Sequence, residues 1–149
     1  MKREEEDELL YRALRIAEQR MLYNDSPLLE SPQAVRDFLL LWAAQQTEES
    51  FGAIWLTSKH QVIDVQILAL GTIDGATVYP RALVRAGIAA NAAAVILFHN
   101  HPSGNPEPSQ ADRTLTTKCK EALVLVDIRL LDHMIIGNSI ISMAESGWI

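Results

Sequence analysis

The chain has 149 residues, the length of one ordinary domain, with 13 basic and 19 acidic side chains and a net charge of −6. Because affinity for nucleic acid depends on neutralising phosphates, this charge argues against DNA binding as the main activity. The single cysteine (Cys119), the lack of a signal-peptide core and the absence of an apolar run near ~20 residues predict a cytoplasmic protein with no membrane partner.

The N-terminal part predicts two amphipathic helices. Apolar residues recur at helical spacing from Glu5 to Tyr23, with charged residues between them. Ser31 and Pro32 then have the chemistry of an N-cap and a first helical position. The second helix carries an apolar stripe, made by Val35, Phe38, Leu39 and Trp42. We expect residues 1–30 to form a helix and linker, ahead of one domain at 31–149.

From Ser50 onward the pattern becomes that of strands separated by helices. Branched and aromatic residues predict two strands at 51–57 and 62–70, joined by a hairpin turn. After a turn at 71–76, further strands are predicted at 77–79, 92–98, 126–131, 133–136 and 139–143, and helices from Pro80 to about Ala90 and from Ser109 to near Leu123. This order predicts an α/β fold with a mixed sheet that has antiparallel strands at both ends.

The polar loop after the strand at 92–98 carries the clearest chemical signal. His99 and His101 are two residues apart, so in an extended chain both point to the same side. Asp112 falls in the first turn of the next helix, where its carboxylate can supply a third ligand. Two histidines, an aspartate and a water make a catalytic type of zinc site, although this donor set also accepts other divalent metals. Ser109 and Asp112 equally fit a helix capping box, which needs no metal.

These residues resemble a known family. His-x-His, seven residues, Ser, two residues and Asp is the JAMM (MPN+) metalloprotease signature, and the sequence from His99 to Asp112 is similar to its RadC branch. Similar stretches at 71–72, 78–81, 91–94, 125–129 and 132–133 extend the resemblance over about 31–149. The resemblance implies a cytidine-deaminase-like JAB/MPN domain with one zinc ion per chain, held by His99, His101 and Asp112. It also implies that Ser109 stabilises an oxyanion during hydrolysis of amide or isopeptide bonds.

The N-terminal residues differ from those of longer RadC proteins, which carry a helix-hairpin-helix region before the catalytic domain. The residues before Ser31 predict one amphipathic helix instead. The chain therefore resembles the short, mobile-element type of RadC-like protein.

The family signature also includes an upstream glutamate that takes a proton from the attacking water. Counting five residues back from Gly71, as in RadC-like chains, gives Gln66, which cannot accept a proton near neutral pH. Since general-base help is worth ~10²–10⁴-fold in rate, this substitution predicts slow chemistry. Asp64, on the same side of the strand, and Glu107, in the loop, are alternative bases.

The sequence thus predicts a zinc-dependent hydrolase, a metallopeptidase or isopeptidase of impaired activity, acting on a protein or peptide that it does not identify. The alternative is an inactive, metal-containing binding module in a DNA-repair or mobile-element context. A DNA-processing activity is disfavoured by the net charge of −6. His133 is expected to make a structural hydrogen bond and Cys119 to be a packed residue. The oligomeric state stays open.

Overall fold

The computed structural model describes residues 1–23, 27–28, 32–70 and 78–149. Its helices are α1 (Arg3–Leu22), α2 (Pro32–Ala44), α3 (Pro80–Ala89) and α4 (Gln110–Val124), and its strands are β1 (Ser50–Leu56), β2 (Val62–Leu70), β3 (Ala94–Asn100), β4 (Arg129–Ile136) and β5 (Ile140–Ser142). The strands form one sheet in the order β2-β1-β3-β4-β5, in which β3 and β4 are parallel and the other neighbours antiparallel. The predicted α/β fold with a mixed sheet is confirmed. Among the described helices, none has the length and apolar character to cross a membrane.

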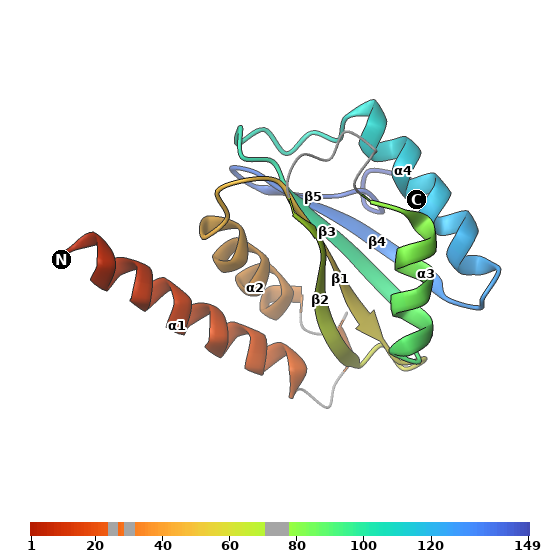
Figure 1. The fold of residues 1–149 in the computed structure, drawn as a ribbon, viewed down its shortest axis with the longest axis horizontal. Coiled ribbons are helices and arrows are strands. Elements are labelled where there is room, and N and C mark those ends of the chain that lie inside the picture. Colours follow the sequence, from red (N-terminus) through yellow and green to blue (C-terminus); the bar gives the residue numbers. More distant parts are fainter. Residues whose placement is uncertain (24–26, 29–31, 71–77) are drawn as a thin grey trace.

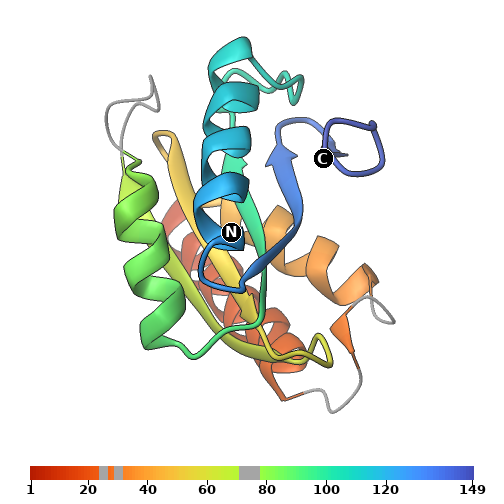
Figure 2. The same cartoon turned by 90° about the vertical axis from the view of Figure 1, so that its right-hand side faces the viewer.

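The molecule has three layers. Helices α1 and α2 lie on one face of the sheet, and α3 and α4 cover the other (Figures 1 and 2). Each face has its own apolar core: Phe38 and Trp42 of α2 pack against Phe98 of β3, and Trp55 of β1 lies in the core on the α3/α4 side. The candidate site lies at the end of β3, on the side of the sheet that α3 and α4 cover.

The alternation of side chains along β3 decides which face His99 joins. Ala94, Ile96 and Phe98 belong to the core beside α2, whereas Val95 and Leu97 belong to the core beneath α3 and α4. Because alternate residues share a face, His99 lies on the α4 side together with Val95 and Leu97. Phe51 of β1, which pairs with His99 in the sheet, stacks on its ring at a centroid distance of 6.2 Å.

Most of the predicted elements are present. All four residues of the predicted stripe on α2 are buried, and α3 has Pro80 at its start. His60 adopts a φ of 62° in the β1–β2 turn, so a histidine provides the left-handed residue that glycine often supplies. Cys119 is buried, as expected, and burial raises the pKa of its thiol to about 11. The predicted cap at Ser31 and the turn at 71–76 lie outside the described residues.

Three predicted boundaries are wrong. Strand β3 begins and ends two residues later than expected, so it includes His99. The segments 126–131 and 133–136 are not two strands, because Asp127 turns the chain with a φ of 60° and one continuous strand runs from Arg129 to Ile136. The short strand at 77–79 is absent from its described part, where Tyr79 is the N-cap of α3.

Gly52 of β1 offers a test of the packing behind the site. A Cβ atom at this position would meet the ring of Phe98 and lie 2.9 Å from the carbonyl oxygen of Gln66. We expect Gly52→Ala to lower the free energy of unfolding by about 1–3 kcal/mol, because the overpacked strand must shift. Urea unfolding measures this, with Ala89→Ser as the control that adds one heavy atom on an exposed part of α3. Equal stability of the two variants would contradict the packing described.

Candidate metal centre

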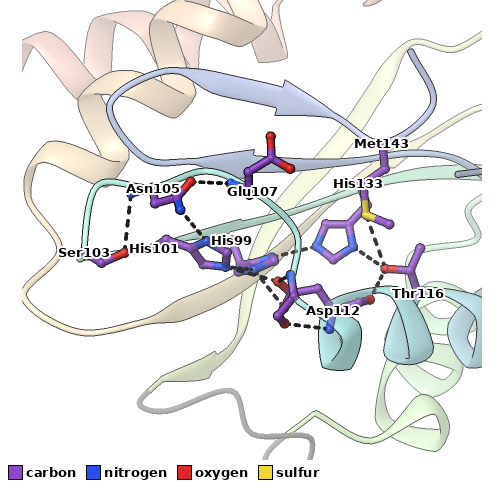
Figure 3. Close-up of polar contacts among 10 residues, drawn as sticks. His99, His101, Ser103, Asn105, Glu107, Asp112, Thr116, His133 and Met143 are labelled. Carbon is purple, nitrogen blue, oxygen red and sulfur yellow. Dashed lines mark hydrogen bonds and ion pairs between the residues drawn. The ribbon is translucent and has the colours of Figure 1, made fainter. Parts of the chain in front are cut away.

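Three potential ligands converge where β3 ends and α4 begins. His99 is the penultimate residue of β3, His101 follows the strand directly, and Asp112 lies in the first turn of α4 (Figure 3). Their ligand atoms all lie within 4.8 Å of one another. The loop 101–109 reverses the chain between the strand and the helix, so residues that are distant in sequence meet at one point. His99, His101 and Asp112 are thereby positioned to hold a metal ion.

The distances between the donor atoms fit a tetrahedral metal site. The two Nε2 atoms of His99 and His101 are 2.9 Å apart. Asp112 presents one carboxylate oxygen to each ring, at 3.2 Å from each Nε2 atom. In a tetrahedral zinc site with bonds of ~2.0–2.1 Å, neighbouring ligand atoms lie about 3.3 Å apart. The side chains need only small shifts to bind an ion between them.

Burial differs among the three residues in the way that an accessible site requires. The side chains of His99 and Asp112 are 1% and 4% exposed, and that of His101 is 12% exposed. One side of the cluster is therefore closed by the protein and the other is open to solvent. Beside His101 lies a groove of about 430 Å³ between the end of α2, the loop at Pro102 and Gly104, and the β4–β5 turn.

The loop fixes the tautomer of the neutral His101 ring. Its Nδ1 atom lies 2.8 Å from the carbonyl oxygen of Asn105, which can only accept, so Nδ1 carries the proton. Nε2 of the neutral ring is then a lone pair that faces His99 and Asp112. The hydrogen bond with Asp112 raises the pKa of His101 above its ordinary value; burial opposes this rise, and the Asn105 carbonyl and the charges of Asp112 and Glu49 add to it.

Asp112 combines the capping role and the ligand role that the sequence left as alternatives. Its backbone N–H donates to Ser109 Oγ at 3.0 Å, and its carboxylate accepts from the Ser109 N–H at 2.8 Å. Burial alone would raise the pKa of Asp112, but the hydrogen bonds with His101 and His99 outweigh it and lower the pKa far below the usual range. The cap thus holds an ionised carboxylate in the direction of both imidazoles.

His133 lies behind the triad and not among the ligands. Its Nε2 atom is 2.7 Å from Nδ1 of His99, and its Nδ1 atom is 2.6 Å from Thr116 Oγ1. Complete burial lowers the pKa of His133 well below its ordinary value, so the ring is neutral. Both nitrogens are engaged in hydrogen bonds, as the predicted structural role requires.

Gln66, in the position of the family's base, and the two alternative bases, Asp64 and Glu107, do not meet the triad. Gln66 pairs with Ala53, two rungs along the sheet from the level of His99, and its amide bonds Trp55 at 3.0 Å and Asp64 at 3.2 Å. Asp64 is four rungs from that level, about 13 Å at ~3.3 Å per residue. In Figure 3 the carboxylate of Glu107 points away from the two imidazoles.

The structure brings a different acidic residue to the site, Glu49, which the sequence analysis missed. Asn100, between the two histidines, accepts from the Ser50 N–H at 2.8 Å and donates to the Glu48 carbonyl at 3.2 Å. The main chain on both sides of Glu49 is thus fixed to the end of β3. Its carboxylate is close enough for its charge to raise the pKa of His101. The signal in the sequence is its position shortly before the predicted strand at 51–57. The structure adds that this strand pairs antiparallel with β3.

Comparison with known proteins agrees with this geometry. The model of the RadC-like JAB domain matches residues 29–148. The chain is 57% identical over 122 residues to a UPF0758 protein of Stutzerimonas stutzeri, covering 81% of this chain and 54% of that protein. It is also 55% identical over 124 residues to a UPF0758 protein of Azotobacter vinelandii, covering 83% and 55% of the two chains. The chain therefore spans about half the length of these two relatives.

A UPF0758 protein of Vibrio cholerae is 43% identical over 144 residues, and this match covers 97% of the chain and 90% of that protein. The match to the family model, over residues 29–148, spans the whole triad, the cap and the strands that carry them. The chain belongs to the RadC-like JAB domain family.

Proposed function

We propose that the protein is a zinc-dependent hydrolase of amide or isopeptide bonds, of the JAMM class. The observation that carries this proposal is the convergence of His99, His101 and Asp112 on one accessible point at ligand distances. Two nitrogens and one oxygen suit zinc and leave a position for water or substrate, as catalytic sites require. When bound, the metal would polarise a carbonyl group and make water more acidic.

Two side chains support hydrolysis in addition to the ligands. Glu49 is a carboxylate beside His101, suited to take a proton from water and deliver it to the leaving amine. Ser109 uses its hydroxyl only as an acceptor in the capping box and is exposed, so its proton is available to stabilise an oxyanion. The groove beside His101 offers room for a segment of the substrate polypeptide on one side of the site.

The alternative, an inactive metal-containing binding module, depended on Gln66 as the residue in the position of the base. With Glu49 beside His101 and Gln66 hydrogen-bonded to Trp55, nothing in the site favours it over the hydrolase. Glu49 takes the place of Gln66 in our proposal, and Asp64 and Glu107 are no longer part of it. A cytoplasmic location and a protein or peptide substrate, with no direct nucleic-acid ligand, complete the proposal.

The metal assignment makes the first prediction. Purified protein loaded with zinc and freed of excess metal should contain about one zinc ion per chain by elemental mass spectrometry. Asp112→Asn removes the charge but keeps an oxygen that can accept from Ser109, so the fold should persist while zinc is lost. Unfolding by heat controls for stability. Zinc absent from the wild type would disprove the proposal.

The raised pKa of His101 sets the pH dependence of that binding. Below this pKa the ring carries a proton on Nε2, which metal must displace, so zinc affinity should fall as the pH falls through a value above 6.5. Competition with a chromophoric chelator across a pH series measures the affinity. An affinity that does not change with pH would show that His101 is not a ligand.

The role of Glu49 makes the third prediction. Glu49→Gln should lower kcat/KM by ~10²–10⁴-fold with the zinc content unchanged, because only the proton acceptor is removed. The substrate is a library of internally quenched peptides that includes lysine-branched isopeptides, and Gln66→Glu is the matched variant at the other position. Activity that appears only in Gln66→Glu would return the base to position 66.

A further inference from the structure

The hydrogen bonds behind His99 have one consistent direction, which can be traced from a fixed end. The carbonyl oxygen of Asp112 can only accept, so Thr116 Oγ1, at 2.7 Å, donates its proton to it. The hydroxyl must then accept from Nδ1–H of His133 at 2.6 Å. With its proton on Nδ1, the neutral His133 ring has an acceptor at Nε2, and Nδ1–H of His99 donates to it at 2.7 Å. Figure 3 shows this chain of contacts.

The direction of the chain determines the state of His99 toward the site. Since the proton of its neutral ring is on Nδ1, the Nε2 atom is left as a lone pair that faces His101 and Asp112. The opposite tautomer would place a proton on Nε2, where a metal must bind. In that tautomer Nε2–H could donate to Asp112 Oδ1 at 3.2 Å, but Nδ1 of His99 and Nε2 of His133 would then be two lone pairs that face each other at 2.7 Å, which is unfavourable.

His133 itself is held rigidly. It is fully buried, and its backbone N–H donates to Asp132 Oδ1 at 2.7 Å. The same carboxylate accepts from Ser142 and from the Ala144 N–H, which fixes β4 to the C-terminal turn. The ring of Phe51 packs edge-on against His133 at a centroid distance of 5.6 Å. Such a ring offers its acceptor in one orientation only.

We propose that His133 is a positioning residue that selects the metal-binding tautomer of His99 and, through Thr116, ties the orientation of that ring to helix α4. This inference rests on the proposed metal site and names a residue outside its ligands. The same helix carries Asp112, so one network sets the direction of two ligands. Hydrogen-bond partners of ligating histidines commonly contribute ~10–100-fold to metal affinity.

The first test needs no variant of the network. In metal-free protein labelled with ¹⁵N-histidine, at alkaline pH, NMR reports which nitrogen of each ring carries the proton. We expect His99 with its proton on Nδ1 and His133 with its proton on Nδ1. A His99 that carries its proton on Nε2 would overturn the inference, whatever the metal content of the protein.

The second test compares three variants by zinc competition with a chromophoric chelator. His133→Leu removes the acceptor and should weaken zinc binding ~10–100-fold, with His99 no longer held in one tautomer. His133→Gln places an amide oxygen near the position of Nε2 and should recover most of that loss. His60→Asn, which removes an imidazole from the β1–β2 turn while tolerating the positive φ, should bind zinc like the wild type.

The outcomes separate this inference from the function on which it rests. Zinc bound equally by the wild type, His133→Leu and His133→Gln would overturn the inference and leave the metal site intact. Zinc bound by none of them, the wild type included, would overturn the proposed function. If His133→Leu fails to fold, Thr116→Val decides, because it removes the hydroxyl that accepts from Nδ1–H of His133: zinc affinity equal to the wild type in that variant overturns the inference.

Discussion

One electrostatic constraint governs the site. When both imidazoles are neutral, three acceptors face one another at 2.9–3.2 Å, namely the Nε2 atoms of His99 and His101 and the carboxylate of Asp112. Acceptors at these distances repel unless a cation lies between them, and a proton or a metal ion can fill that role. The surrounding residues keep the arrangement in place because each Nδ1–H donates away from the site: His101 donates to the Asn105 carbonyl, and His99 donates to Nε2 of His133.

Helix α4 meets this constraint with parts that serve the fold at the same time. The capping box of Ser109 and Asp112 satisfies N–H groups at the start of the helix and also aims the carboxylate. One turn later, Thr116 bonds the Asp112 carbonyl and the His133 ring. Capping and metal binding are therefore not competing explanations of the Ser-x-x-Asp pattern. The start of a helix is a suitable place for a charged ligand, because its N–H groups and dipole favour the ionised form.

The sequence predicts well those parts of the site whose residues are close together along the chain. The two histidines, the cap and the ligand lie within one strand, loop and helix start, so their spacing alone brings them together. The contacts that it does not predict depend on pairing between distant segments. Glu49 reaches the site because β1 runs antiparallel to β3, and His133 because β4 runs parallel to it. Strand ends were misjudged where a non-glycine residue with positive φ, such as Asp127, set the turn.

Sheet topology separates Gln66, the residue in the predicted position of the base, from the two histidines. Gln66 lies on β2, and β1 separates β2 from β3, so two strand spacings of ~4.8 Å lie between it and the histidines, in addition to its offset along the sheet. A residue at the start of β1 is next to β3 and at the level of its end, because β1 is the antiparallel neighbour of β3 and begins where β3 ends. Asn100 makes that proximity fixed, since one side chain bonds the main chain on both sides of Glu49. Among the described residues, strand order therefore brings an acidic residue near the two histidines at the position that precedes β1.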